Sequence, residues 1–435
     1  MVLDFLRFSK ACRPDKALDM GKAEDRQYYI DFSSVRGGEI IKEIARTITL
    51  SPDEQTCQLL TGHIGCGKST ELLRLKSELE KQKIHVVYFE SSQDLDLVDV
   101  GISDILLAIA GRISENLESI GIKLRPRFFT NLLADIVKLL NTPIEIGTEL
   151  SVGIAKITAK TKQNPQERSQ LREYLESKTS NLLTSINEEI LAKANQELKE
   201  RGKKGLVVIV DNLDRVNNRI MASGRTLPEY LFIDQGSQLG GLNCHVVYTI
   251  PLSLKFSSDI ETLTQRLGGG RSPRILPMVP VQMKDGRVCE AGMEQLRQMV
   301  LIRAFPNLSE QERLQQISEV FDSSDTLERL CRVSGGHVRK VVALLSSCCI
   351  QIDDPPIPYH YLERVIREER NKLAVAIREH QWELLRQVKQ NKKIVGSDPE
   401  YQKLLRSMFV YEYRDEYAGS WFDINPLLAE AEELR

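Results

Sequence analysis

The sequence predicts an α/β protein built around a parallel β-sheet, and three observations lead to this prediction. An apolar run at 57–61 enters a glycine-rich loop, and a helical pattern and a second apolar run at 84–89 follow it. This strand–loop–helix–strand order is a βαβ unit, which requires a parallel sheet covered by helices. The run at 206–210 is unbroken and β-branched, which is typical of a strand buried on both faces. Two further apolar runs, at 245–250 and 274–278, complete the predicted sheet.

Length, composition and charge limit the class of protein. The 435 residues exceed what one hydrophobic core usually organises, so we expect two or three domains. The formal net charge is −2 and the pI is about 6.4, which gives no basic field that would attract nucleic acid. Asp4 interrupts the first apolar run, unlike in a signal peptide, and no apolar stretch approaches the roughly 18 residues of a membrane span. We therefore expect a cytoplasmic protein without a membrane partner.

A glycine-rich loop occupies residues 62–69 and has the sequence Gly-His-Ile-Gly-Cys-Gly-Lys-Ser, which matches the phosphate-binding pattern G-x4-G-K-S at every specified position. An incidental glycine turn is the alternative. Glycines let the backbone curl so that N–H groups point at phosphate oxygens, and the next helix offers its N-terminus. Lys68 would reach the β and γ phosphates of ATP, Ser69 would ligate Mg²⁺, and Thr70 would donate to the α phosphate. The predicted nucleotide-binding residues are Gly62, Gly65, Cys66, Gly67, Lys68, Ser69 and Thr70.

An acidic tip follows the buried strand at 206–210. Asp211 comes directly after this strand, where open α/β sheets place ligand chemistry, so we expect it to hold Mg²⁺ together with Ser69. Asp214 lies one helical turn further on and is a candidate to polarise an attacking water. The alternative for Asp214 is a helix cap, or a salt bridge with Arg215 or Arg219.

Two other sets of side chains could ligate metal ions. The eight cysteines are scattered without C-x-x-C spacing, so we interpret them as buried reduced thiols. Asp94, Asp96, Asp99 and Asp104 are compatible with a cation site or with a solvated loop and helix N-cap. We favour the loop and cap, because Asp is preferred at both.

The region 111–200 is interpreted as an insertion into the sheet domain. Alternating residues at 144–147 and 150–154 predict a small hairpin within it. An apolar stripe then predicts one long helix. This stripe consists of Leu171, Leu175, Leu182, Ile186 and Ile190.

Three motifs resemble those of additional-strand P-loop ATPases, namely AAA+ proteins, especially the origin-recognition type, and the STAND and KAP ATPases. The first is the loop at 62–70. The second is Asp-Asn-Leu-Asp at 211–214, which is similar to a D-x-x-D form of the Walker B strand. The third is Ser-Gly-Gly-His-Val-Arg at 334–339, which is similar to the second sensor of a helical lid. The resemblance covers about residues 26–350.

The resemblance implies a P-loop NTPase fold of the AAA+ type, with a small helical lid and a C-terminal winged-helix-like domain. The predicted divisions are an N-terminal arm at 1–25, an ATPase domain at 26–290 with the insertion near 111–200, a lid at 291–352 and a winged-helix-like domain at 359–435.

The resemblance also implies roles for further residues. Thr249 stands where such ATPases keep a polar first sensor, and Arg339 would contact the γ phosphate from the lid. An arginine acting on a neighbouring subunit's ATP would be Arg266, Arg271 or Arg274, and we favour Arg266 because a helix aims it rigidly. The predicted catalytic residues are Lys68, Asp214, Thr249, Arg339 and Arg266. AAA+ ATPases usually have glutamate after the Walker B aspartate, whereas this chain has Asn212, so we expect slow hydrolysis.

The C-terminal region has the pattern of a winged helix. A helical segment at 401–408 precedes two alternating runs at 409–413 and 420–424, and Asn425 would start a last helix. In origin-recognition proteins such a domain binds DNA. Residues 371–435 carry ten Lys or Arg and eleven Asp or Glu, and acidic residues 415 and 416 lie at the tip of the hairpin. We therefore favour packing against protein over contact with DNA.

Taken together, these features predict an ATP-binding, Mg²⁺-dependent slow ATPase. It would act as a nucleotide-controlled switch with a protein partner or by self-assembly. The first alternative is a DNA-binding ATPase of the origin-recognition or loader type. The second is a nucleotide-stabilised scaffold that does not hydrolyse ATP. ATP turnover measured with and without DNA separates the three.

Overall fold

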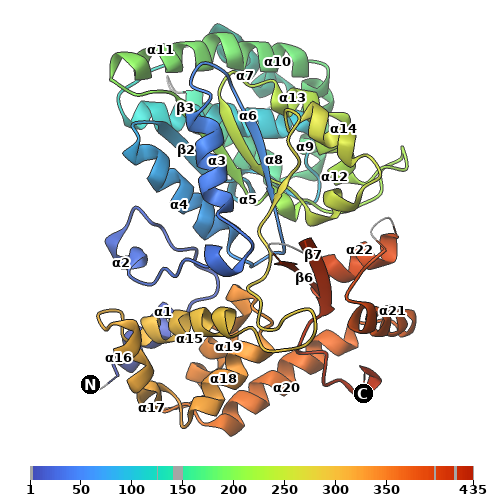
Figure 1. Ribbon diagram of the computed structural model, residues 1–435. Helices are drawn as coiled ribbons and strands as arrows, with labels where there is room; N and C mark the ends of the chain where they lie inside the picture. The colour runs from blue at the N-terminus through green and yellow to red at the C-terminus, as the bar shows by residue number, and fades with distance from the viewer. Residues whose placement is uncertain (1–2, 125, 141–149, 396–397, 416–418, 435) are drawn as a thin grey trace. The chain divides into compact units, whose positions relative to one another are not determined.

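The computed structural model describes residues 3–124, 126–140, 150–395, 398–415 and 419–434 (Figure 1). The chain divides into two compact units. The first unit comprises Met1–Ile40, Gly62–Leu73 and Ile275–Arg435, and the second comprises Ile41–Thr61 and Arg74–Arg274. The chain therefore passes between the units several times, and the glycine-rich loop groups with the first.

A five-stranded sheet organises the second unit. Its strands are β1 (Cys57–Thr61), β2 (His85–Glu90), β3 (Leu206–Asp211), β4 (His245–Thr249) and the short β5 (Arg274–Ile275), in the order β2-β3-β4-β1-β5. The pairs β2–β3, β3–β4 and β1–β4 are all parallel. The predicted α/β fold with a parallel sheet is confirmed. The strand expected at 274–278 has only two residues, because Pro277 has no N–H to donate to a ladder.

The parallel register places two predicted site residues, Asp211 and Thr249, at one edge of the sheet. Glu90 pairs with Asp211, and Leu60 pairs with Thr249. Thr61 is the last residue of β1, so the carboxyl ends of β1, β3 and β4 meet at this edge. The glycine-rich loop begins at the next residue in the chain.

Helices and short turns connect these strands. They are α3 (Ile40–Thr49), α4 (Lys68–Lys81), α5 (Ser91–Asp94), α6 (Ile102–Ser119), α12 (Leu227–Glu229), α13 (Gly236–Gly240) and α14 (Ile260–Arg266), with 3₁₀ turns at Leu213–Arg215 and Leu252–Phe256 and a π-helix at Tyr230–Asp234. Helix α6 packs against β2 and β3. All six residues of β3 are buried, as the unbroken apolar run predicts.

The insertion between β2 and β3 is helical over most of its described residues. Its helices are the end of α6, α7 (Arg127–Leu139), α8 (Leu150–Gln163), α9 (Pro165–Glu176), α10 (Thr179–Ser185), a π-helix at Ile186–Leu191 and α11 (Ala192–Glu200). The predicted hairpin is wrong at 150–154, which begins α8, and its first half at 144–147 lies outside the described residues. Leu150, Ile154 and Ile157 are buried, and their spacing places them on one face of a helix. This helical spacing of the apolar residues outweighs the alternation over five residues that suggested a strand. Ile154 packs against Gly111 of α6, where a β-carbon would lie only 2.9 Å away.

The predicted long helix at 171–190 is interrupted. Its apolar stripe is buried as expected, at Leu171, Leu175, Leu182, Ile186 and Ile190. The helix nevertheless ends at Glu176 and restarts at Thr179. The Thr179 hydroxyl donates to the Leu175 carbonyl at 3.2 Å and to the Glu176 carbonyl at 3.0 Å, a side-chain contact that bends helices.

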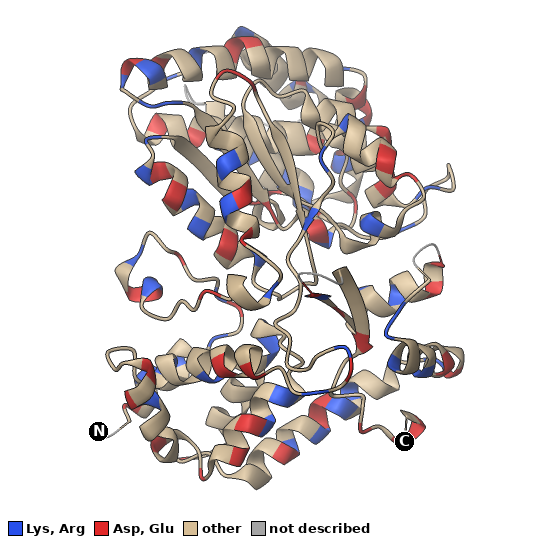
Figure 2. Ribbon diagram, in the orientation of Figure 1, with Lys and Arg blue, Asp and Glu red and all other residues tan. Residues whose placement is uncertain are grey.

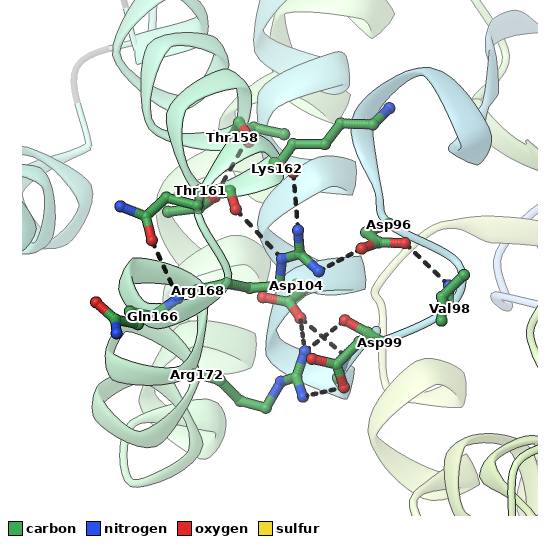
Figure 3. Close-up of polar contacts among 12 residues, drawn as sticks. Asp96, Val98, Asp99, Asp104, Thr158, Thr161, Lys162, Gln166, Arg168 and Arg172 are labelled. Atoms are coloured by element: carbon green, nitrogen blue, oxygen red, sulfur yellow. Dashed lines mark hydrogen bonds and ion pairs between the residues drawn. The ribbon is translucent and has the colours of Figure 1, made fainter.

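Arginines neutralise the aspartates of the segment 94–104 (Figure 3). Asp94 pairs with Arg112 at 2.7 Å, outside this view, and Asp96 pairs with Arg168. Asp99 pairs with Arg172 at 2.6 Å and also with Arg219, while Asp104 accepts the Gly101 N–H at 2.8 Å. Among the described residues, no cluster of acidic, histidine or cysteine side chains could hold a metal ion. The network instead attaches helix α9 to the loop after β2, and Arg219 extends it to the segment after β3.

The first unit is mainly helical. Its elements are α1 (Phe5–Ala11), α2 (Ala23–Arg26), a 3₁₀ turn at Ser33–Val35, α15 (Glu290–Ala304), α16 (Glu310–Gln315), α17 (Ile317–Val320), α18 (Ser324–Val333), α19 (Val338–Gln351), α20 (Tyr359–Val375), α21 (Glu379–Asn391), α22 (Pro399–Arg406), β6 (Val410–Asp415), β7 (Gly419–Ile424) and a 3₁₀ turn at Glu432–Leu434. Residues 291–352, predicted as a helical lid, are mainly helical, and their assignment as a lid stays a prediction. Within the predicted N-terminal arm at 1–25, Phe8 and Cys12 are buried in a hydrophobic core that includes residues of α15 and α19.

The C-terminal hairpin is confirmed, and the helix after it is not. Strands β6 and β7 pair antiparallel, with Val410 opposite Ile424. The following residues form turns, because the Asn425 side chain accepts the Leu427 N–H and donates to the Met408 carbonyl. The winged-helix assignment itself stays a prediction.

Two further expectations concern cysteines and membranes. All eight cysteines are free thiols and six of them are buried, as interpreted from the sequence. Across the described residues, none of the helices combines the length and the apolar character that a membrane span requires.

The arginine network generates a test of what attaches the insertion. Replacing Arg172 by Met should lower the free energy of unfolding by about 1–3 kcal/mol, because partly buried Asp99 and Asp104 lose a cation. Arg219→Met is the matched control, since its side chain is 44% exposed against 18% for Arg172, and it should cost about 0–1 kcal/mol. Urea unfolding measures both. If both variants lose the same free energy of unfolding, the burial of an arginine does not determine how much its ion pairs stabilise the protein.

Candidate nucleotide site

The glycine-rich loop adopts a conformation that its glycines make possible. Gly62, Gly65 and Gly67 have φ values of 150°, 85° and 110°, in the region that side chains disfavour. A β-carbon on Gly62 would lie 2.4 Å from the Leu276 carbonyl oxygen, so only glycine fits there. Lys68 is 5% exposed, and its ammonium donates to the carbonyls of Gly62 at 2.8 Å and of residue 63 at 2.9 Å. The lysine side chain therefore bonds back to the start of its own loop and stabilises the curled backbone.

An N-terminal segment supports the next part of the loop. Arg36 is buried, stacks on the Phe32 ring and donates from Nη2 to the Cys66 carbonyl at 2.9 Å. Burial lowers the pKa of the Arg36 guanidinium, which still keeps its proton. The Thr70 hydroxyl accepts the Leu18 N–H at 3.2 Å. Arg36 was not among the residues predicted from sequence.

The predicted second sensor also binds the loop, mainly through a histidine. His337 accepts the Lys340 N–H on Nδ1 at 2.9 Å, so its neutral ring carries the proton on Nε2. That Nε2 donates to the Ile64 carbonyl at 2.7 Å. Burial lowers the pKa of His337 to about 3, so the ring is neutral at physiological pH. The backbone N–H of Arg339 donates to the Gly65 carbonyl at 3.1 Å.

The C-terminal hairpin contacts the same loop. The Glu412 N–H donates to His63 Nε2 at 2.9 Å. The Tyr411 ring packs against His63 and His337, with ring centroids 5.8 and 5.9 Å apart. The Tyr413 hydroxyl donates to the Gly335 carbonyl at 2.9 Å. Sequence reasoning missed these contacts, because they join residues up to 349 positions apart.

Each carbonyl from residue 62 to residue 67 thus accepts a hydrogen bond from a known donor. The last of these bonds runs from the Glu71 N–H to the Gly67 carbonyl at 3.1 Å, in the first turn of α4. When a loop points its backbone N–H groups toward an anion, its backbone carbonyls point the other way, into the protein. There they need hydrogen-bond donors from other residues. Lysine, the N-terminal segment, the lid motif and the helix supply these donors.

The second unit contains Asp211, one of the two predicted metal ligands, and Thr249, the predicted first sensor. Asp211 is 1% exposed, and its carboxylate accepts from the Tyr88 hydroxyl at 2.9 Å and from the Asn212 N–H at 2.7 Å. Asn212 has a φ of 65°, a left-handed conformation that asparagine tolerates. The Thr249 hydroxyl accepts the Leu213 N–H at 3.1 Å and so ties β4 to the turn after β3.

The remaining candidates are distributed around the second unit. Asp214 lies in the 3₁₀ turn at Leu213–Arg215, and Arg219, one of its suggested partners, pairs with Asp99. Arg266 ends α14 and is exposed, as is Arg271. Arg274 donates to Gln58 at 3.0 Å and to Thr47 at 3.3 Å, which engages it within its own chain.

The His337 contact predicts a pH dependence of stability. The folded-state pKa of about 3 lies below the ordinary value of about 6.5, so the unfolded chain binds the proton more readily. The stabilisation is therefore complete above pH 6.5 and is lost as the pH falls from 6.5 toward 3. In His337→Gln, whose amide can still donate to Ile64, the melting temperature should fall less steeply over this range.

His360→Gln serves as the control, because His360 is exposed, and its melting curve should follow that of the parent protein. If His337→Gln loses as much stability as the parent between pH 6.5 and pH 3, the ring of His337 does not carry this dependence.

Comparisons with known proteins show what the loop-bearing domain is similar to. Residues 38–232 match the model of the KAP family P-loop domain. No curated protein matches the chain. Similar solved structures include the ORC2 protein of Aeropyrum pernix, at 12% identity over 100% of this chain and 97% of that chain with a TM-score of 0.41. They also include the Walker-type ATPase PABY2304 of Pyrococcus abyssi, at 12% identity, 93% and 98% coverage and a TM-score of 0.44.

A third similar structure is CDC6P of Pyrobaculum aerophilum, at 13% identity, with 94% of this chain and 96% of that chain covered and a TM-score of 0.35. The family match spans the glycine-rich loop and the strand that ends in Asp211. It agrees with the parallel sheet and with the resemblance drawn from the motifs. Residues 38–232 therefore resemble the P-loop domain of the KAP family, and the parallel sheet around them has the fold of a P-loop NTPase.

Proposed function

We propose that this protein is an ATP-binding, Mg²⁺-dependent slow ATPase that acts as a nucleotide-controlled switch. One observation carries the proposal: consecutive residues of the phosphate loop bond to the lid motif and to the C-terminal hairpin. Residue 63 contacts Glu412, residue 64 contacts His337, and residue 65 contacts the backbone of residue 339. A shift of the loop on binding phosphate would therefore change the contacts of both regions.

The donor set fits Mg-ATP. The loop offers Lys68 and backbone N–H groups for the phosphates, with Ser69 and Thr70 following in the chain. Asp211 and Ser69 are the proposed Mg²⁺ ligands, because carboxylate and hydroxyl oxygens are the hard ligands that this ion prefers. Bound Mg²⁺ would neutralise phosphate charge during hydrolysis. Arg339 and Thr249 are proposed to sense the γ phosphate.

Slow hydrolysis is proposed because the position after Asp211 lacks a carboxylate. Asn212 is an amide that cannot take a proton from water, and its side chain donates to the Ser92 hydroxyl at 3.3 Å. Asp214 is the proposed residue that positions the attacking water. Its role in catalysis stays a proposal that turnover measurements decide.

We propose that a protein partner, or a second copy of the chain, binds according to the nucleotide state of this protein. Arg266 is the favoured arginine to act in trans, because it is exposed at a helix end whereas Arg274 is engaged. Activity per chain that rises with protein concentration would support this role, and a concentration-independent rate would exclude it.

DNA binding is the less favoured alternative. Most of the hairpin is buried in the first unit, including Tyr411, Tyr413 and Trp421, so it offers little surface for DNA. Acidic and basic residues are interspersed along the helices, as Figure 2 shows. Strong, salt-sensitive retention of duplex DNA by the full chain would reverse this preference.

Mg-ATP should stabilise the protein. At about a thousand times its dissociation constant, the ligand should add roughly 4 kcal/mol to the native state and raise the melting temperature by about 8–16 °C. Lys68→Ala should abolish this shift, because the loop loses its cation. Lys76→Ala is the matched control, since Lys76 lies on the same helix and pairs with Glu80. The absence of a shift in the parent protein would refute ATP binding.

Substitution of Asp211 and of Asp214 should impair different properties of the protein. Asp211→Asn should weaken the Mg²⁺ dependence of ATP binding, because it removes charge beside the proposed cation. Asp214→Asn should leave binding unchanged and lower turnover by about 10²-fold, if Asp214 positions water. Binding and steady-state turnover are measured on the same preparations, with Asp285→Asn as an exposed control. Normal turnover in Asp214→Asn would place the catalytic residue elsewhere.

A further inference from the structure

A cavity in the first unit is lined by none of the residues of the phosphate loop, although one of its lining residues, Leu18, contacts Thr70 just after that loop. It has a volume of about 460 Å³, which is within the range of small-molecule sites. Helix α1, the segment at 13–28 and the end of α15 line it. We call it the Arg303 pocket, because Arg303 is its only buried cationic lining residue among those described.

Arg303 is a buried cation without a carboxylate partner in the described part of the chain. Its side chain is 6% exposed, its Nη1 donates to the Met299 carbonyl, and its Nε has no acceptor. By contrast, Arg297 and Arg329 of this unit, which are partly buried, are paired with Glu328 and Glu363. Burial lowers the pKa of Arg303, but a guanidinium keeps its proton, so its charge stays unbalanced.

The end of α15 offsets only part of this charge. Arg303 stands in the last turn, where the helix dipole favours a cation. That effect is small beside the desolvation of an ion, which only a nearby anion or several hydrogen bonds offset. An anion in the pocket would supply both, because a guanidinium has five N–H donors in a planar fork.

The rim of the pocket carries more positive than negative charge. Arg7, Lys10, Arg13 and Lys16 line it together with Asp4, Glu24 and Asp25. The acids are partly engaged. Asp4 caps α1 by accepting the Arg7 N–H at 3.0 Å, and Asp25 pairs with Lys16 at 2.5 Å. Lys10 and the phenol of Tyr28 are further donors that a multi-oxygen anion could use.

We propose that the Arg303 pocket binds a small phosphorylated molecule. Its volume exceeds what inorganic phosphate fills, and its donors suit an anion with several oxygens. Bound phosphate would pair with Arg303 at the floor and with Lys10 at the rim. The pocket also borders the phosphate loop, because Leu18 lines it and donates its N–H to Thr70. Occupancy would thus be linked to ATP binding.

The test uses full-length Lys68→Ala protein, so that the phosphate loop contributes little. Tripolyphosphate and pyrophosphate are titrated at constant ionic strength, and binding is followed by calorimetry and by melting temperature. Saturable binding and stabilisation are expected. Adding Arg303→Met should weaken binding by about tenfold or more and should raise the melting temperature without anion, since an unpaired buried charge is removed.

Two further variants keep the proposal testable if Arg303→Met folds poorly. Lys10→Ala changes an exposed rim residue and should weaken binding severalfold. Arg287→Ala is the control, because Arg287 belongs to the same unit, is 80% exposed and lies outside the pocket. The proposal is overturned if Lys10→Ala and Arg303→Met bind as the parent does, or if the anions do not bind saturably. Citrate binding as tightly as tripolyphosphate would overturn the phosphate class.

Discussion

The curled phosphate loop depends on hydrogen bonds to its inward-facing carbonyls. A backbone that offers N–H groups to an anion on one side presents carbonyls on the other, and buried carbonyls without donors are costly. Lys68 satisfies the first two, His337 and the Arg339 N–H satisfy the next two, and Arg36 satisfies that of Cys66. The lysine usually described as a phosphate ligand is therefore also part of the internal bonding of the loop. Any ligand that draws Lys68 outward changes the balance of these bonds.

This constraint explains the unusual division of the chain. Strand β1 belongs to the sheet of the second unit, yet the loop that follows it groups with the first. The donors for its carbonyls come from the N-terminal segment and from residues after 330, so the loop packs where its hydrogen bonds are made. The same bonds draw in the hairpin, because Glu412 binds His63 while Tyr411 packs on His337. The glycine-rich loop is thereby hydrogen-bonded both to His337 and to the C-terminal hairpin.

Sequence reasoning found the parts of this arrangement that are local. The strands, the glycine-rich loop and the helical region after 290 follow from periodicity and from a motif whose spacing is short. It failed where two periods competed, as at 150–154, where burial on a helical face prevailed over a brief alternation. It also missed the partners of the aspartates at 94–104, because Arg168 and Arg172 lie more than 70 positions away in the chain. His337 and Arg36 went unassigned for a second reason: they bind backbone carbonyls, and the identity of a residue does not show which partner its carbonyl will have.

Buried bases in this protein are accommodated in two physically different ways. His337 is neutral, since burial lowers its pKa to about 3, and its ring donates a hydrogen bond to the Ile64 carbonyl. A guanidinium has no such option, because its proton stays bound even when desolvation lowers its pKa. Arg36 and Arg303 therefore stay charged although no carboxylate pairs with either within the described residues. Arg36 lies against a loop shaped for phosphate, where an anion is expected. Arg303 is likewise a buried cation without a paired carboxylate among the described residues, and it lies at a pocket. An anion bound in that pocket would balance its charge.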